Sequence, residues 1–146
     1  MKTGHRHRAR EAAFQMLYQW DVGKVEPGAV PGLYDAIEQD DAEPLAAPAR
    51  AFAEELVAGT IARVAEIDAL IAQHAQHWRI ERIATVDRLI LRLGIYELLY
   101  GHDTPAGVVI DEAIELARTF SEEDAVRFVN GVLDGVHKSL PGPQPA

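Results

Sequence analysis

The chain has 146 residues, the size of one domain, and can bury roughly 70% of the surface that its unfolded form exposes. It contains no cysteine, which excludes disulfides, thiolate metal sites and a cysteine nucleophile and fits a reducing compartment. No apolar run approaches the ~20 residues that a membrane span requires, and the N-terminus lacks the apolar segment of a signal peptide. We therefore expect a soluble, cytoplasmic protein.

Charge is distributed unevenly on this acidic protein, whose formal net charge is -9. The first ten residues, MKTGHRHRAR, hold four of the 14 lysines and arginines and no acidic residue. The remaining 136 residues hold 10 basic side chains against 23 acidic ones. This asymmetry predicts a basic arm for a polyanion on an acidic body, with a solvated, disordered terminus as the alternative.

Apolar residues recur at helical spacing along nearly the whole chain, which predicts an all-α protein. The first helix is predicted over 8–21, and its core stripe consists of Ala9, Ala12, Ala13, Met16, Leu17 and Trp20. Two linkers follow at 22–32 and 40–48, with a short helix around Leu33 and Ile37 between them.

A long helix is expected from about Ala49, and 67–75 either continues it or restarts at Asp68. Its inward residues are predicted to be Phe52, Leu56, Ile61 and Val64. The segment 80–100 is apolar on nearly every side, which is typical of a helix buried at the centre of a bundle. Glycines at 59, 94 and 131 interrupt helical patterns and predict close helix crossings, with a functional backbone contact as the alternative.

Two sequence signals predict the starts of the last two helices. In GHDTP, Thr104 is expected to cap the next helix with Pro105 in its first turn, and Ile110, Ala113, Ile114 and Ala117 form its inner face. SEED at 121–124 has the spacing of a capping box and predicts the start of the last helix. The inner face of that helix consists of Phe128, Val129, Val132, Leu133 and Val136.

Catalytic and metal-binding patterns are missing from the sequence. There is no Walker A motif, G-x-G-x-x-G, G-x-S-x-G or H-E-x-x-H, so we expect no enzymatic activity and no cofactor. His74 with His77, and Asp134 with His137, have a chelating spacing, but the second half of a di-iron carboxylate site is absent. We interpret both pairs as surface residues and predict no metal site.

Two aromatic residues of the first helix lie off its core stripe. At 100° per residue, four residues lie roughly 90–160° from the centre of the stripe, namely His7, Arg10, Phe14 and Tyr18. Either a second helical layer covers these aromatic residues, or they meet a partner. An arginine-rich helix start flanked by aromatic rings also favours RNA, because guanidinium groups contact phosphates and unpaired bases stack on rings.

Three segments of the sequence carry a resemblance to a known family, namely RHRAREAAFQMLYQWD at 6–21, VDRLILRLGIYELL at 86–99 and VIDEAIELARTFSEEDAVRFVNGVLD at 109–134. Together they resemble the NusB family of bacterial antitermination factors, and the resemblance runs from about 6 to 136. It implies about seven helices in a single domain over 1–140, with an N-terminal bundle at about 1–78, a C-terminal bundle at about 79–138 and a disordered tail at 141–146.

The resemblance also implies a function and partners. Members of the family pair with NusE, a small-subunit ribosomal protein, bind the boxA element of nascent RNA and support antitermination by RNA polymerase on ribosomal RNA operons. The RNA-binding positions would be Arg6, His7, Arg8, Arg10, Phe120, Asp124, Arg127 and Phe128. The NusE-binding positions would be Tyr18, Glu81 and Asp87, whose acids suit a basic partner. An acid at Asp124 is expected to restrain RNA binding.

Two alternatives remain open at this point. The chain could be a helical interaction module or a homodimer, since some members of the family self-associate. NusB-like domains also begin an RNA cytosine methyltransferase, but that enzyme needs a cysteine nucleophile, and this sequence has none.

Overall fold

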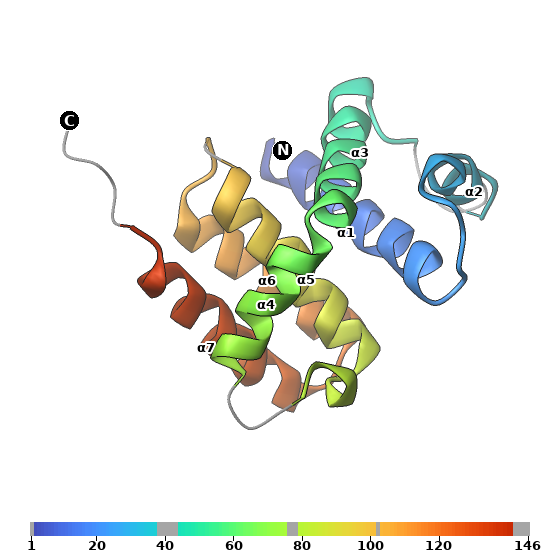
Figure 1. The fold of residues 1–146 in the computed structure, drawn as a ribbon. Helices are drawn as coiled ribbons and strands as arrows, with labels where there is room; N and C mark the ends of the chain where they lie inside the picture. The colour runs from blue at the N-terminus through green and yellow to red at the C-terminus, as the bar shows by residue number, and fades with distance from the viewer. Residues whose placement is uncertain (1, 38–43, 76–78, 102, 142–146) are drawn as a thin grey trace. The chain divides into compact units, whose positions relative to one another are not determined.

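The computed structural model describes residues 2–37, 44–75, 79–101 and 103–141. In this part of the chain it contains seven α-helices, two short 3-10 helices and no β-strand, so the prediction of an all-α fold is confirmed (Figure 1). The elements are α1 (Lys2–Asp21), η1 (Pro27–Ala29), α2 (Val30–Ile37), α3 (Ala47–Ala62), α4 (Val64–His74), η2 (Ile80–Arg82), α5 (Thr85–Tyr100), α6 (Ala106–Phe120) and α7 (Glu123–Ser139). None of these helices is both long and apolar enough to span a membrane. Residues 142–146 of the expected tail lie outside the described residues.

The chain divides into two compact units, Met1–Ala62 and Arg63–Ala146. The division falls between α3 and α4 rather than near residue 78, because α4 packs against α5 and α7. Arg63 separates the two helices with a non-helical backbone, φ -111° and ψ 16°. A separate helix, α4, therefore begins at Val64, four residues before the predicted restart at Asp68.

In the first unit, α1 packs against both α2 and α3. Five residues of the predicted α1 stripe are fully buried, namely Ala9, Ala12, Ala13, Met16 and Leu17. On α3 the buried residues are Ala49, Ala53, Leu56, Val57 and Thr60, so the inner face is rotated from the predicted one. Both contact faces are rich in alanine, which permits close approach of the two helices. Phe52, expected in the core, is instead half-buried at the edge of this contact.

One arginine links α2 to α3 in the same unit. The Arg50 guanidinium donates to the Asp35 carboxylate, with Nη2 2.9 Å from Oδ2, and to Glu54 Oε2, with Nε 2.6 Å away. It also donates to the Pro31 carbonyl oxygen at 3.3 Å. Hydrogen bonding to Arg50 lowers the pKa of Asp35 below its ordinary value.

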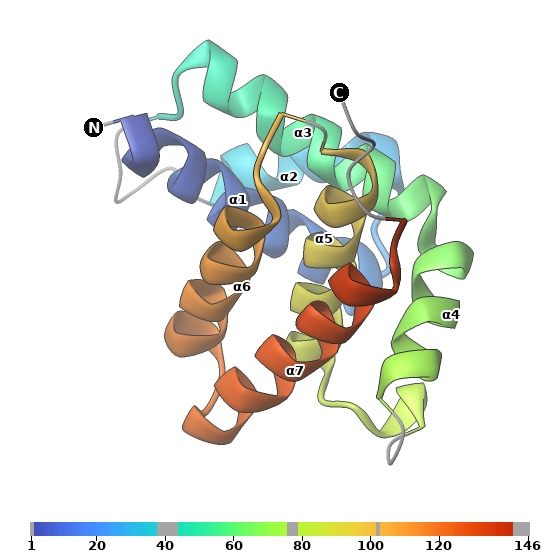
Figure 2. The same cartoon turned by 90° about the vertical axis from the view of Figure 1, so that its left-hand side faces the viewer.

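In the second unit, α5 is the central helix, as predicted, and contacts α4, α6 and α7. Figure 2 shows α4 and α6 flanking α5 while α7 crosses in front of it. The helix also contains two buried charged residues that its apolar pattern did not predict, Arg92 at 8% exposure and Glu97 at 2%. Arg92 forms a fork with Asp68 of α4, because Nε and Nη2 each lie 2.8 Å from one carboxylate oxygen. The predicted helix 80–100 begins at Thr85, since 80–82 form η2.

Both predicted helix caps in this unit are wrong. Pro105 occupies the N-cap position of α6, which has no side-chain cap hydrogen bond, so Thr104 is not the cap. The N-cap residue of α7 is Glu122, again without a side-chain cap bond. The Ser121 hydroxyl, expected to cap α7, donates instead to Asp87 of α5.

The buried faces of α6 and α7 largely follow the predicted stripes. The buried residues are Val109, Ala113, Leu116 and Ala117 on α6, and Ala125, Val129, Val132, Leu133 and Val136 on α7. Ile110, Ile114 and Phe128, predicted to face inward, are half-buried. Phe128 is half-buried because its side chain lines a pocket beside the helix.

The structure tests two of the three predicted glycine crossings. A methyl group on Gly94 of α5 would lie 3.1 Å from Leu133 Cδ1 of α7, which confirms close packing there. At Gly131 of α7, no atom lies within 4 Å of such a methyl group, so the prediction of a close crossing is wrong. The crossing at Gly59 stays a prediction.

Candidate functional site

The basic N-terminal segment is helical, because α1 begins at Lys2 rather than near residue 8. Helical spacing puts Arg6 and Arg10 one turn apart on the same face of α1. Both reach the aromatic ring of Phe52 on α3, and their Cζ atoms lie 4.0 Å and 5.2 Å from its centroid. Arg6 is exposed, whereas Arg10 is only 4% exposed. One guanidinium is thus presented at the surface while the other is packed inside.

Two other predicted RNA-binding residues of α1 are partly covered. His7 Nε2 lies 3.3 Å from Glu11 Oε2, one turn along the helix, and each side chain is 31% exposed. Glu11 thus places a negative charge beside His7. Arg8 is half-buried. Among the arginine side chains of this segment, Arg6 is therefore the exposed one.

The structure separates the two aromatic residues that lie off the α1 stripe. Phe14 is 4% exposed, so the protein itself covers it, as the first of the two alternatives predicts. Tyr18 is 38% exposed and is one of the large apolar side chains at the surface. Tyr18 is therefore accessible to a partner, whereas Phe14 is not.

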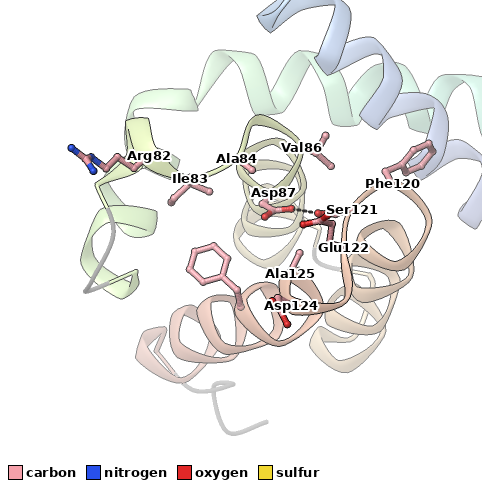
Figure 3. A pocket seen from close by; sticks show the side chains of 11 residues that line it. Arg82, Ile83, Ala84, Val86, Asp87, Phe120, Ser121, Glu122, Asp124 and Ala125 are labelled. Atoms are coloured by element: carbon pink, nitrogen blue, oxygen red, sulfur yellow. Dashed lines mark hydrogen bonds between the residues drawn. The ribbon is translucent and has the colours of Figure 1, made fainter.

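A pocket of about 600 Å³ lies in the second unit, at η2, the start of α5 and the junction of α6 with α7 (Figure 3). It brings together three of the four predicted RNA-binding residues of this segment with Asp87, which is predicted to bind the partner. The residues that line it are Arg82, Ile83, Ala84, Val86, Asp87, Phe120, Ser121, Glu122, Asp124, Ala125 and Phe128.

One hydrogen bond joins two residues that line this pocket, and another connects the neighbouring elements η2 and α5. The Ser121 hydroxyl donates to Asp87, with Oγ 2.6 Å from Oδ1, as the dashed line in Figure 3 marks. Arg88 Nη1 donates to the Ile80 carbonyl oxygen at 3.3 Å and so holds η2 against the first turns of α5. Ser121 is not among the site residues predicted from the sequence, because the spacing of SEED at 121–124 favours a capping box.

The pocket combines apolar walls with an acidic rim. Asp87, Glu122 and Asp124 contribute carboxylates, while Arg82 is the basic residue among those that line it. In Figure 3 the Arg82 side chain extends away from these three acids. Such a lining suits an apolar or aromatic group that carries a hydrogen-bond donor, and it disfavours a phosphate inside the pocket.

Some of the predicted residues lie outside this pocket. Arg127 and Glu81 are exposed but do not line it. Of the two pairs with a chelating spacing, the first includes His77, which lies outside the described residues. In the second, Asp134 forms an ion pair with Lys138, with Nζ 2.9 Å from Oδ2. Across the described residues, no group of three or more histidine, aspartate or glutamate side chains is arranged to hold a metal ion.

The NusB family model matches residues 7–138 of this chain. The chain belongs to the NusB family. It is 50% identical over 140 residues to the transcription antitermination protein NusB of Solibacter usitatus (strain Ellin6076), which covers 94% of this chain and 92% of that relative. The resemblance predicted from the three sequence segments is therefore confirmed.

Solved structures of NusB proteins share the fold. T. maritima NusB superposes with a TM-score of 0.80 at 35% identity, covering 92% of this chain and 91% of that one. A crystal structure of antitermination factors NusB and NusE in complex with dsRNA matches with a TM-score of 0.81 at 31% identity, covering 93% of this chain and 98% of that one.

Proposed function

We propose that this chain is a transcription antitermination factor that binds boxA RNA together with NusE in the cytoplasm. In this role it supports processive transcription of ribosomal RNA operons as part of the RNA polymerase antitermination complex. The similarity to NusB in a complex with NusE and dsRNA supports the proposal. The observation that carries it is the exposed Arg6 guanidinium at the N-terminus of an otherwise acidic chain.

The RNA-binding surface in this proposal consists of two segments with different roles. On α1, Arg6 contacts phosphate directly, while Arg10 supports it from a buried position; His7 and Arg8 complete the segment. On α7 and the end of α6, Arg127 supplies positive charge, while the Phe120 and Phe128 rings beside the pocket suit unpaired bases. Asp124 opposes binding by its charge.

NusE binds a separate set of residues, namely Tyr18, Glu81 and Asp87. The exposed Tyr18 ring supplies apolar area, and the two acids complement a basic ribosomal protein. This division assigns the acidic body to the protein partner and the basic helix start to RNA. Neither role requires a catalytic step, a metal or a cofactor.

Fluorescence anisotropy tests this proposal, with a labelled boxA RNA titrated by the full chain, alone and with NusE, beside a scrambled RNA. We expect a preference for boxA that NusE strengthens. If Arg6, Arg8 and Arg127 contact phosphates, log Kd should change with log salt by a slope of about 2, since each contact to a single strand contributes about 0.7.

Substitution of Arg6 and Arg8 by alanine should reduce both the affinity for boxA and this salt dependence. Arg118→Ala is the matched control, because Arg118 is an exposed arginine of α6 paired with Glu115 at 2.7 Å. Equal binding of boxA and scrambled RNA in the presence of NusE would contradict the proposal.

A second candidate function is that of a protein-interaction module or homodimer without sequence-specific RNA binding. Two exposed apolar side chains favour it, Tyr18 in the last turn of α1 at 38% and Val22 directly after the helix at 46%, because they lie four residues apart. Light scattering over a dilution series detects such a dimer. Tyr18→Ser together with Val22→Ser should then shift the protein to the monomer.

A further inference from the structure

We propose that Phe52 is a positioning residue that holds the Arg6 guanidinium in the orientation in which it binds RNA phosphate. This inference rests on the proposed function and adds to it a residue of α3 that contacts no RNA itself. It also accounts for an unexpected feature of α3, whose buried face consists largely of small residues while its phenylalanine lies half-buried at the edge.

The geometry at Arg6 is that of a guanidinium stacked on an aromatic face. Its Cζ atom lies over the Phe52 ring, 4.0 Å from the centroid, well within the distance of about 6 Å at which a cation is attracted to a ring. Stacking uses the flat face of the guanidinium, whereas its N–H donors point outward in the plane. The donors therefore remain available to phosphate oxygens while the ring restricts the rotation of the side chain.

Arg6 also differs from other arginines of this protein in its charge partners. Arg50, Arg92 and Arg118 each form an ion pair with a carboxylate. Within the described part of the chain, Arg6 forms no ion pair, and its guanidinium stacks on the Phe52 ring. The ring orients the positive charge without neutralising it, as an RNA-binding residue requires.

The second arginine on this ring stabilises the arrangement. Arg10 Cζ lies 5.2 Å from the Phe52 centroid, and Arg10 is 4% exposed. Because Arg10 is buried, its contact with Phe52 holds α1 against α3 at this point. Arg6, one turn away, is thereby kept at a constant distance from the same ring. An arginine held in place before binding loses less rotamer freedom when it contacts phosphate.

A double-mutant cycle on boxA affinity tests the positioning role, using the full chain with NusE. Phe52→Leu keeps an apolar side chain but removes the ring, and we expect it to weaken RNA binding by about threefold, the size of the entropy cost of immobilising one long side chain on binding. In an Arg6→Ala background the same substitution should cause no further loss. Phe52→Tyr keeps the ring and should restore the affinity.

A second readout is independent of RNA. In the free protein, the ring current of Phe52 should shift the Arg6 side-chain methylene protons upfield in NMR spectra. The shift should persist in Phe52→Tyr and vanish in Phe52→Leu. A thermal unfolding curve of each variant checks that the helices remain folded.

Three results would overturn the inference. They are an unchanged RNA affinity in Phe52→Leu, an equal loss of affinity with and without Arg6, which indicates a packing role, and the absence of the ring-current shift. Failure of the proposed function is distinguishable from these, since the unaltered chain would then show no preference for boxA in the presence of NusE.

Discussion

The Ser121 hydroxyl donates a hydrogen bond to the Asp87 carboxylate, with 2.6 Å between Oγ and Oδ1. Ser121 is the C-cap residue that follows α6, and Asp87 lies in the first turn of α5, so this bond joins the α6–α7 junction to the central helix. It also places a residue that we assign to the NusE face at the rim of the pocket lined by Phe120 and Asp124.

Removal of this hydroxyl should weaken the second unit. Ser121→Ala is expected to lower the free energy of unfolding by about 1 kcal/mol, the usual contribution of one hydrogen bond, as measured by urea denaturation. Ser139→Ala is the control, because the Ser139 hydroxyl donates to Val136 within the last turn of its own helix, and it should cost less. Equal effects of the two substitutions would contradict the role of the Ser121–Asp87 bond.

The charge of Asp87 can be separated from its hydrogen bond. Asp87→Asn keeps an oxygen that accepts from Ser121 but removes the negative charge. We expect little change in stability and a weaker affinity for NusE, measured by isothermal titration calorimetry, since the partner is basic. A large loss of stability without a change in NusE affinity would assign Asp87 to the fold alone.

The fork between Arg92 and Asp68 should contribute strongly to stability, because the Arg92 side chain is only 10% exposed. Asp68→Ala leaves that guanidinium partly buried without this partner, and we expect a loss of about 2–3 kcal/mol in urea denaturation. Glu115→Ala breaks an exposed pair with Arg118 and should cost less than about 0.5 kcal/mol. A similar loss of unfolding free energy in both variants would show that burial does not increase the contribution of the Arg92–Asp68 pair to stability.

Two glycines should respond in opposite directions to alanine. Gly131→Ala adds a methyl group with no atom within 4 Å and should stabilise α7 by about 0.5–1 kcal/mol. At Gly94 the same methyl group lies 3.1 Å and 3.2 Å from the two Leu133 methyl carbons, so Leu133 must shift. Leu133 is fully buried, and we expect Gly94→Ala to lower the thermal midpoint. A higher thermal midpoint in both variants would mean that Leu133 can shift without a loss of packing.

Stability in acid should depend on Asp35. Its pKa is lowered in the folded protein, chiefly by the hydrogen bond from Arg50, so its contribution is present above its unfolded pKa of about 3.9 and is lost as pH falls through the folded value. Asp35→Asn should therefore be destabilising at pH 7, by less than about 1 kcal/mol because the side chain is 56% exposed. Urea denaturation of both proteins between pH 7 and pH 3 should show the difference shrinking in acid. A difference independent of pH would contradict this assignment.

Asp124→Asn should strengthen boxA binding by about twofold, the effect of removing one exposed, salt-screened repulsion. Glu123→Gln is the matched control, because Glu123 is exposed on the same first turn but does not line the pocket. Anisotropy at two salt concentrations should show the gain for Asp124 fading as salt rises. Unchanged or weaker binding by Asp124→Asn would show that its carboxylate does not oppose RNA.

The sequence alone determined the helical class, the approximate helix positions and the family. These properties follow from local information, because the 3.6-residue recurrence of apolar side chains specifies a helix and its buried stripe. The stripe of α1 and the central position of α5 were both predicted in this way. The family followed from three segments whose residues can be compared one by one.

Tertiary structure decided the properties that depend on which side chains meet. The Ser121 hydroxyl donates a hydrogen bond to a carboxylate 34 positions away and does not cap the start of α7. No local spacing of residues predicts that partner. Phe52 was expected in the core, but the alanine-rich contact of α1 with α3 leaves it at the edge, where Arg6 and Arg10 reach its ring. Which side chains are buried and which form pairs depends on the residues that lie nearby in space. The partners of Arg10, Arg92 and Ser121 are therefore defined only by the packing of the helices.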